Sequence, residues 1–207
     1  MTVRYEDLLN ADPELALREG GAHFSGESAV HTALRRITTR LDELGIAYAL
    51  AGGMALFLQG YRRFTEDVDI LVSPAGLARI HQQLAGRGYR PVFAGSRALR
   101  DVETGVRIEF LLAGEFPGDG KPKPLSFPEP EAAAVVVNGI RCLRLANLIE
   151  LKLESGRLPG RLRDLADVQE LIKALHLPAD YAEDLHASVR ERYRELWAGL
   201  QALPPER

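Results

Sequence analysis

The sequence predicts an α+β fold, in which a small mixed β-sheet is flanked by helices and followed by a C-terminal helical region. Short apolar runs bounded by glycine, proline or serine alternate with amphipathic helical patterns over residues 28–143. After Leu145 the pattern is wholly helical. With 46% hydrophobic residues among 207, the chain has enough apolar material for a buried core. We expect an N-terminal arm over residues 1–27, a core over 28–143 and a helical region over 144–207.

The first elements follow from glycine placement and apolar spacing. Because Gly20-Gly21 lies in a stretch with little periodicity, we expect a short helix near Tyr5 to Leu9 and then an irregular arm. From Ser28 to Leu44 apolar residues recur at every third or fourth position, which predicts a helix with one buried face that ends at Gly45. Ser28 is a suitable N-cap for that helix.

The centre of the chain predicts a strand, a glycine turn and a helix, followed by further strands. Ile46 to Ala51 is an apolar run too short for a helix, and Gly52-Gly53 lets the chain turn directly into a helix over Met54 to Gly60. Asp67 to Val72 is the second expected strand. The elements expected next are a helix over 75–87, a strand over 89–93 and a hairpin of strands over 99–103 and 106–112, whose polar first arm is suited to a sheet edge.

A proline-rich segment separates these elements from a second hairpin. Glu115 to Pro130 can form neither a helix nor an inner strand, so we expect a surface loop long enough to suggest a function. Asn138-Gly139 between Ala133–Val137 and Ile140–Leu143 is typical of a two-residue hairpin turn. Helices are expected over residues 145–155, 162–175 and 178–200.

Composition and charge exclude several classes of protein. The net charge of -3 and pI of about 6.0 exclude a strongly basic nucleic-acid-binding domain. A single cysteine, Cys142, rules out an intrachain disulfide and fits a reducing compartment. The N-terminus is acidic and lacks a signal-peptide pattern, and no apolar run approaches the roughly 20 residues that would span a bilayer. We therefore expect a cytoplasmic protein without a membrane partner.

Two aspartates one residue apart suggest a metal site. Side chains two positions apart on a strand point to the same face, so Asp67 and Asp69 present their carboxylates together. At about 4 Å and an effective dielectric near 20, the pair repels by roughly 4 kcal/mol, which a divalent cation would relieve. Oxygen ligands favour Mg²⁺ or Mn²⁺ over zinc. Glu109, in an otherwise apolar run, is the candidate third ligand, and three carboxylates can hold two metals.

Structural explanations compete with each of these interpretations. Glu109 could simply pair with Arg107 or Arg63, and the aspartate pair could be a solvated strand end. Gly52-Gly53 allows the backbone to approach a phosphate closely, but it could equally be an ordinary tight turn between strand and helix.

The motifs together resemble a known superfamily. Gly52-Gly53, Arg63-x-Thr65-x-Asp67-x-Asp69 and Ile108-Glu109-Phe110 resemble the hG[GS]…DhD…h[DE]h signature of the DNA polymerase beta-like nucleotidyltransferase superfamily. With Leu151-Lys152-Leu153 and the stretch from Arg161 to Asp167, the chain is similar to the AbiEii/MenT-like branch, whose members include toxins of toxin–antitoxin pairs. The resemblance implies a nucleotidyltransferase fold and covers roughly residues 45 to 175.

The resemblance also implies roles for individual residues. Asp67 and Asp69 would bind metal, and Glu109 would complete the acidic set and act as a base, although glutamate in place of aspartate changes the ligand distance. Lys152 would reach a phosphate, and Asp164 would orient groups near the same site. The residues implied to bind the nucleotide are Gly52, Gly53, Arg63, Thr65, Lys152 and Asp164.

The leading functional hypothesis is a metal-dependent nucleotidyltransferase that transfers NMP from an NTP to a hydroxyl acceptor on RNA, such as tRNA, on protein or on a small molecule. It would use Mg²⁺ or Mn²⁺, and an antitoxin is a possible partner. The alternatives are a catalytically silent nucleotide-binding or interaction module of the same fold, and an interaction protein that uses its C-terminal helices. A tRNA acceptor needs an extended basic surface, so the positions of Lys121, Lys123, Arg157 and Arg161 relative to the aspartates discriminate between acceptors.

Overall fold

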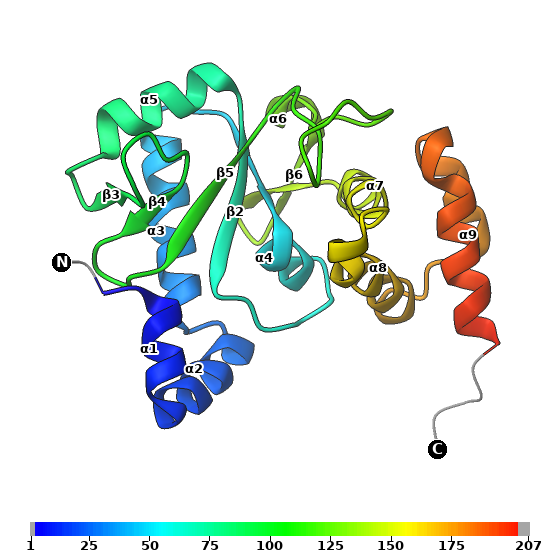
Figure 1. Ribbon diagram of the computed structural model, residues 1–207, viewed down its shortest axis with the longest axis horizontal. Helices are drawn as coiled ribbons and strands as arrows, with labels where there is room; N and C mark the ends of the chain where they lie inside the picture. The colour runs from blue at the N-terminus through cyan, green and yellow to red at the C-terminus, as the bar shows by residue number, and fades with distance from the viewer. Residues whose placement is uncertain (1–2, 203–207) are drawn as a thin grey trace.

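A mixed seven-stranded sheet with strand order β3-β4-β5-β2-β1-β7-β6 forms the centre of the molecule in the computed structural model, which describes residues 3–202 (Figure 1). The strands are β1 (Tyr48–Ala51), β2 (Asp67–Val72), β3 (Tyr89–Pro91), β4 (Leu99–Asp101), β5 (Arg107–Leu112), β6 (Ala134–Val137) and β7 (Ile140–Leu143). The helices are α1 (Tyr5–Ala11), α2 (Pro13–Ser25), α3 (Ala29–Glu43), α4 (Gly52–Leu58), α5 (Pro74–Leu84), α6 (Pro130–Ala133), α7 (Leu145–Ser155), α8 (Leu162–Ala174) and α9 (Ala187–Gln201), with 3-10 turns η1 (Pro159–Arg161) and η2 (Ala179–Asp184). This architecture confirms the predicted α+β class, with a mixed sheet among helices and a helical C-terminal part.

The sheet places the two strands that carry the predicted carboxylates side by side. β2 pairs antiparallel with β1 and parallel with β5, in a register that sets Asp69 opposite Glu109. Val68 and Ile70 alternate with the aspartates and are fully buried, because helices α3 and α5 cover the other face of these strands. One face of β2 therefore belongs to the core, and the other is left for polar side chains.

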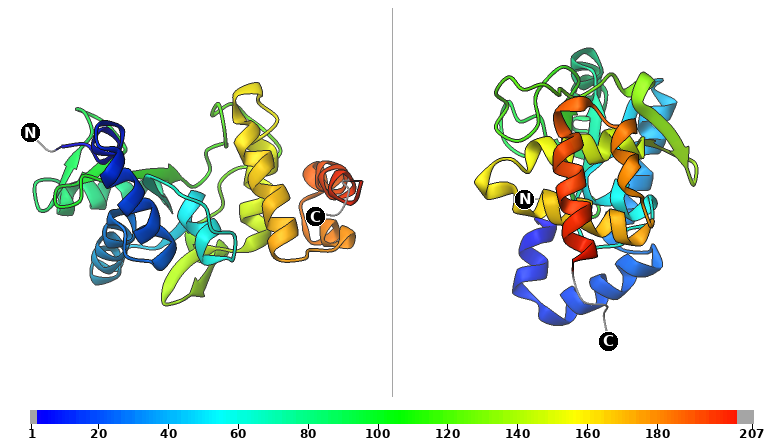
Figure 2. Two further views of the ribbon diagram at one scale, coloured as in Figure 1. Left: turned by 90° about the horizontal axis from the view of Figure 1, so that it is seen from below. Right: turned by 90° about the vertical axis from the view of Figure 1, so that its right-hand side faces the viewer.

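The helices at the two ends of the chain lie at opposite ends of the molecule. Figure 2 shows α1 and α2 at the end that holds β3 and β4, and α9 at the other end, where it packs on α7 and α8. Among residues 3–202, no helix combines the length and the apolar character needed to cross a membrane. The division at residues 27 and 143 stays a prediction, and its outermost parts, residues 1–2 and 203–207, lie outside the described residues.

The predicted irregular N-terminal arm is wrong, because residues 13–25 form helix α2. Asp12 caps this helix by accepting hydrogen bonds from the amides of Glu14 and Leu15, Pro13 occupies the first turn, and Gly26 ends the helix in a left-handed conformation. Two glycines inside a helix cost roughly 1 kcal/mol each relative to alanine. The capping interactions and the burial of α2 against α3 offset that cost.

Two further expectations are corrected. β4 is not a sheet edge, since β3 pairs with it on the outside, and its polar residue Arg100 is buried in an ion pair with Glu6 of α1. The single helix expected over residues 178–200 is instead η2 followed by α9, because His186 breaks the run and caps α9 by accepting from the Ser188 amide. The Asn138-Gly139 turn is confirmed, with both residues at positive φ.

A buried histidine pair lies beneath α4. The rings of His23 and His31 contact each other at a tilt, and both meet the Phe57 ring edge-on. Both share the Ser28 hydroxyl, and His31 Nε2 has no hydrogen-bond partner within residues 3–202. Burial, followed by the charges of His23 and Arg35, lowers the pKa of His31 to about 4. His31 is therefore neutral in the folded protein at pH values where an unfolded histidine is protonated.

Acid is expected to destabilise the fold through His31. Because its pKa is depressed on folding, its contribution is present above about pH 6.5 and is lost as the pH falls towards 4. The free energy of unfolding is measured by chemical denaturation at pH 7 and at pH 4.5. Between these pH values it should fall by about 2 kcal/mol more in the wild type than in His31→Gln. His81→Gln, on α5, should behave as the wild type. Equal losses in wild type and His31→Gln would contradict this account.

Candidate active site

A cleft of about 640 Å³ lies between the polar face of β2 and β5, helices α7 and α8, and the loop that follows β5. The loop crosses towards α7, where Gly118 lies against Leu158. Phe116, Pro117 and Phe127 of this loop line the cleft, so the proline-rich segment is a surface loop, as predicted, and also a wall of the cleft. The predicted site residues that line the cleft are Gly52, Gly53, Arg63, Thr65, Asp67, Asp69, Glu109, Lys152 and Asp164.

Asp67 and Asp69 point into the cleft from β2. Thr65 donates a hydrogen bond of 2.8 Å to Asp67 Oδ1, which fixes that carboxylate. Neither aspartate forms an ion pair with an arginine, lysine or histidine in the part of the chain that the structure describes. Burial and the charge of Asp67 raise the pKa of Asp69 to about 7, with Glu109 adding to the effect. Lys152 and Arg63 act in the opposite direction but do not cancel these effects, so the two carboxylates form a concentration of negative charge without a direct ion-pair partner among residues 3–202.

Glu109 lies beside Asp69 because β5 pairs in parallel with β2. Its carboxylate accepts a hydrogen bond from Arg107, two residues earlier on the same strand. This is one of the two structural pairings considered for Glu109, and it holds the carboxylate at the rim of the cleft. Within residues 3–202, no three His, Cys, Asp or Glu side chains come together as a ready-made metal site.

The donor set still suits a hard divalent cation. Asp67 and Asp69 supply carboxylate oxygens on one face of one strand, and their mutual repulsion is the kind of strain that a bound cation relieves. Among the described residues, neither histidine nor cysteine lines the cleft, which disfavours zinc. The chemistry of these side chains therefore fits Mg²⁺ or Mn²⁺.

Gly52 brings the backbone into direct contact with Asp69. Its φ is +60°, and a side-chain carbon built on it would lie 1.7 Å from Asp69 Oδ2. A similar carbon on Gly53 would lie 2.8 Å from Thr65 Oγ1 and 3.1 Å from Arg63 Nη1. Glycine is needed at both positions because the backbone, the carboxylate and the guanidinium share one small volume.

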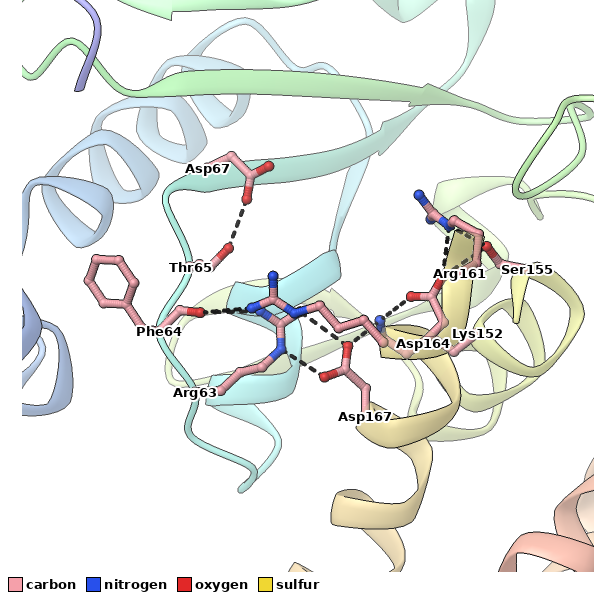
Figure 3. Close-up of polar contacts among 10 residues, drawn as sticks. Arg63, Phe64, Thr65, Asp67, Lys152, Ser155, Arg161, Asp164 and Asp167 are labelled. Atoms are coloured by element: carbon pink, nitrogen blue, oxygen red, sulfur yellow. Dashed lines mark hydrogen bonds and ion pairs between the residues drawn. The ribbon is translucent and has the colours of Figure 1, made fainter. Parts of the chain in front are cut away.

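A buried carboxylate to which the motif resemblance assigned no role, Asp167, joins Arg63 to Lys152. Asp167 of α8 accepts from Arg63 Nε at 2.8 Å and Nη2 at 3.1 Å, and from Lys152 Nζ at 2.7 Å (Figure 3). The Asp167 side chain is only 3% exposed and lies behind the two cations as seen from the cleft. These contacts link the loop that precedes β2 to helices α7 and α8.

Asp164 completes this arrangement one turn earlier on α8. It accepts from Lys152 Nζ at 2.9 Å, from Ser155 at 2.9 Å and from Arg161 at 3.0 Å. Burial opposes its ionisation, but Lys152 and Arg161 outweigh burial and lower the pKa of Asp164 below its usual value. Lys152 is thus held between two carboxylates, and we refer to Arg63, Lys152, Asp164 and Asp167 as the Asp167 network.

The four cations expected to discriminate between acceptors do not form one surface around the cleft. Arg161 lines the cleft, whereas Arg157 donates to the Ser188 carbonyl and Lys123 pairs with Asp119. Lys121 does not line the cleft. Instead Arg163, which donates to the Phe64 carbonyl at 3.5 Å, and Arg97, paired with Glu115, line the cleft.

Sequence reasoning missed the roles of Asp167 and Arg97. The spacing of Asp164 and Asp167, one turn apart on a helix that also carries Arg161, was a usable signal for a polar helix face. Such spacing favours local pairing, which holds for Arg161 with Asp164 but not for Asp167. Asp167 finds its partners 104 and 15 residues away, at positions that only the folded chain brings together.

The fold is shared with solved nucleotidyltransferases. ANT(2")-Ia, solved in complex with adenylyl-2"-tobramycin, matches with a TM-score of 0.52 and 14% identity over 83% of this chain and 98% of that chain. An antigenic nucleotidyltransferase-like protein from Paracoccidioides brasiliensis matches with a TM-score of 0.48 and 16% identity, over 82% of this chain and 85% of the other. The lincosamide antibiotic adenylyltransferase LnuA, in its lincomycin-bound form, gives 0.42 and 18%, over 65% and 92%.

The comparison with ANT(2")-Ia establishes the nucleotidyltransferase fold, which confirms the fold predicted from the motifs. At this level of identity it establishes the fold alone. No protein-family model matches the chain, and no curated protein matches it in sequence.

Proposed function

We propose that this protein, which has the nucleotidyltransferase fold, transfers NMP from an NTP to a hydroxyl group of an acceptor and releases pyrophosphate. The observation that carries the proposal is the pair of aspartates, Asp67 and Asp69, which lack a cationic side-chain partner within residues 3–202 and face a cleft lined by Arg63 and Lys152. Carboxylates without an ion-pair partner, in one cleft with cations that are held in place, suit a substrate that brings both phosphate and a divalent ion.

In the proposed reaction, the acidic residues bind the metal, and the basic residues and the glycine backbone bind the phosphates. Asp67 and Asp69 would hold Mg²⁺ or Mn²⁺, which would neutralise phosphate charge and so lower the barrier to displacement. Gly52 and Gly53 let the triphosphate approach the backbone, and Arg63 and Lys152 bind its anionic oxygens. These groups position the α-phosphorus for attack.

The transfer breaks one bond and forms one. The acceptor oxygen attacks the α-phosphorus, the bond from that phosphorus to the oxygen bridging the β-phosphorus breaks, and pyrophosphate leaves with the bonding electrons. Glu109, beside Asp69 in the sheet register, accepts the proton of the acceptor hydroxyl. Arg107 keeps the Glu109 carboxylate at the cleft rim until the acceptor arrives.

The cation positions favour a small hydroxylated molecule as the acceptor. Of Lys121, Lys123, Arg157 and Arg161, only Arg161 lines the cleft, so these four do not provide the extended basic surface that a tRNA acceptor needs. A volume of about 640 Å³ lies within the usual range of small-molecule sites. A toxin role with an antitoxin partner rests on the motif resemblance to the AbiEii/MenT-like branch.

Label transfer tests the proposal. The protein is incubated with each α-labelled NTP and with a small-molecule extract, total RNA or cell protein, in Mg²⁺, Mn²⁺ or EDTA. We expect label in the small-molecule fraction with either metal, and a loss of at least about 100-fold in EDTA. Label on RNA or protein would overturn the acceptor assignment but keep the reaction.

The Glu109–Arg107 pair is the specific observation that favours the silent-module alternative, since a binding module has no need of a free third carboxylate. That alternative predicts NTP binding that does not depend on metal, without label transfer in any fraction. Metal-dependent transfer rejects it.

A further inference from the structure

We propose that Asp167 is a positioning residue that makes the cleft selective for triphosphates, by holding Arg63 and Lys152 in fixed places as a pair. This inference rests on the proposed function and deepens it. Asp167 does not line the cleft, so it acts through the two cations and does not touch the substrate.

The first supporting observation is that both carboxylate oxygens of Asp167 accept hydrogen bonds from the two cations. One oxygen, Oδ1, accepts from Arg63 Nε, and the other, Oδ2, accepts from both Arg63 Nη2 and Lys152 Nζ. The Arg63 contact is the two-pronged arginine–carboxylate geometry, which fixes the plane of the guanidinium as well as its position. A buried carboxylate with these contacts sets both the separation and the orientation of its two partners.

The second observation is that both cations keep donors for a ligand. Arg63 uses three of its five N–H groups, two on Asp167 and one on the Phe64 carbonyl. Lys152 uses two of its three, on Asp164 and Asp167. Both side chains line the cleft, and Arg63 Nη1 lies 3.1 Å from the position of a carbon on Gly53. The remaining donors are therefore held beside the glycine backbone.

The third observation is the charge balance. Asp164 and Asp167 are surrounded by Arg63, Lys152 and Arg161, which leaves a net charge of +1 at this wall of the cleft. Asp67 and Asp69 line the same cleft from β2. A ligand that binds across the cleft must present anionic oxygens to the cations and metal-bridged oxygens to the aspartates. A triphosphate is long enough to do both, whereas a nucleoside monophosphate carries one phosphate.

Without Asp167 the two cations would separate. Lys152 has a flexible four-carbon stem and would rely on Asp164 alone, and Arg63 would keep only its contact to the Phe64 carbonyl. The binding of the β- and γ-phosphates should weaken, and the binding of the base, sugar and α-phosphate should change little.

The test compares the affinity for each NTP with that for the matching NMP, measured by titration in Mg²⁺ for the wild type, Asp167→Asn and Asp167→Glu. Asp167→Asn removes the charge, and Asp167→Glu keeps the charge but moves the carboxylate by one methylene. We expect each folded variant to lower the NTP-to-NMP affinity ratio at least about 10-fold. Glu170→Gln, one turn further along the same helix and exposed, should keep the wild-type ratio.

A double-substitution cycle separates positioning from general weakening. In the Asp167→Asn background, the further loss in NTP affinity from Lys152→Met should be smaller than in the wild type, because Lys152 is already displaced. An unchanged ratio in either folded variant overturns the inference, and failure of both variants to fold would assign Asp167 a structural role and overturn it too. Wild-type protein that binds none of the NTPs would instead reject the proposed function, and the inference with it.

Discussion

Replacing both cleft aspartates, as Asp67→Asn and Asp69→Asn together, is expected to lower nucleotidyl transfer at least about 1,000-fold while the melting temperature at pH 8 stays the same or rises. Asparagine keeps the shape but removes both anions, and charge stabilisation of this kind contributes several kcal/mol at roughly 1.4 kcal/mol per tenfold in rate. The measurement is an initial rate of label transfer together with a thermal melt in EDTA.

The expected rise in stability follows from the sign of the Asp69 pKa shift. Because its pKa is raised to about 7 on folding, the folded protein binds a proton more tightly than the unfolded chain. The associated stability is present below about pH 4 and is lost as the pH rises through 7. At pH 8 the wild type therefore carries the repulsion that the double variant lacks.

A matched pair elsewhere distinguishes site chemistry from loss of charge. Asp180→Asn with Asp184→Asn removes two exposed carboxylates from η2, away from the cleft, and should leave the transfer rate within about twofold. A double cleft variant that unfolds, or that still transfers label, would contradict the assignment of Asp67 and Asp69 to the reaction.

Gly52→Ala is expected to destabilise the fold by about 2 to 5 kcal/mol and to abolish metal-dependent NTP binding. Alanine in the left-handed conformation costs about 1 to 2 kcal/mol, and its methyl carbon would meet Asp69 Oδ2 at 1.7 Å, so either the carboxylate or helix α4 must move. Denaturant unfolding and NTP titration in Mg²⁺ measure the two effects.

Gly20→Ala is the matched control, with an effect of the opposite sign. Gly20 lies inside α2, and a carbon built on it meets nothing within 4 Å. Alanine there should stabilise the protein by up to about 1 kcal/mol through helix propensity, without an effect on NTP binding. If Gly52→Ala were as well tolerated as Gly20→Ala, the close approach of backbone and carboxylate would not be required.

Local patterns predicted the parts of the molecule that depend on neighbours in sequence. The alternation in β2 identified which side chains face the cleft, and Asn138-Gly139 identified its hairpin turn, because both are properties of a few consecutive residues. The helix α2 was missed because its two glycines were weighed without the local start signal of Asp12 and Pro13. Contacts that only the fold supplies, such as the hydrogen bond from Tyr5 to Glu19, add to its stability.

Contacts between residues far apart in the chain could not be predicted from the sequence. Motif resemblance placed Arg63, Lys152 and Asp164 in one site, and all three line one cleft. It could not show that Asp167 joins Arg63 to Lys152, since that contact depends on how α8 docks beside the loop before β2. Likewise, Glu109 pairs with Arg107 and not with Arg63. This outcome depends on side-chain conformation, and the sequence was compatible with either pairing.

The most direct test of nucleotidyl transfer in this cleft is a comparison of α-labelled and γ-labelled NTP in Mg²⁺ with the acceptor fraction. Transfer of NMP predicts that label from the α-position appears on the acceptor, that label from the γ-position appears only in pyrophosphate, and that both signals vanish in the Asp67→Asn, Asp69→Asn double variant. Label from the γ-position on the acceptor, or α-label transfer that survives in the double variant, would contradict the account.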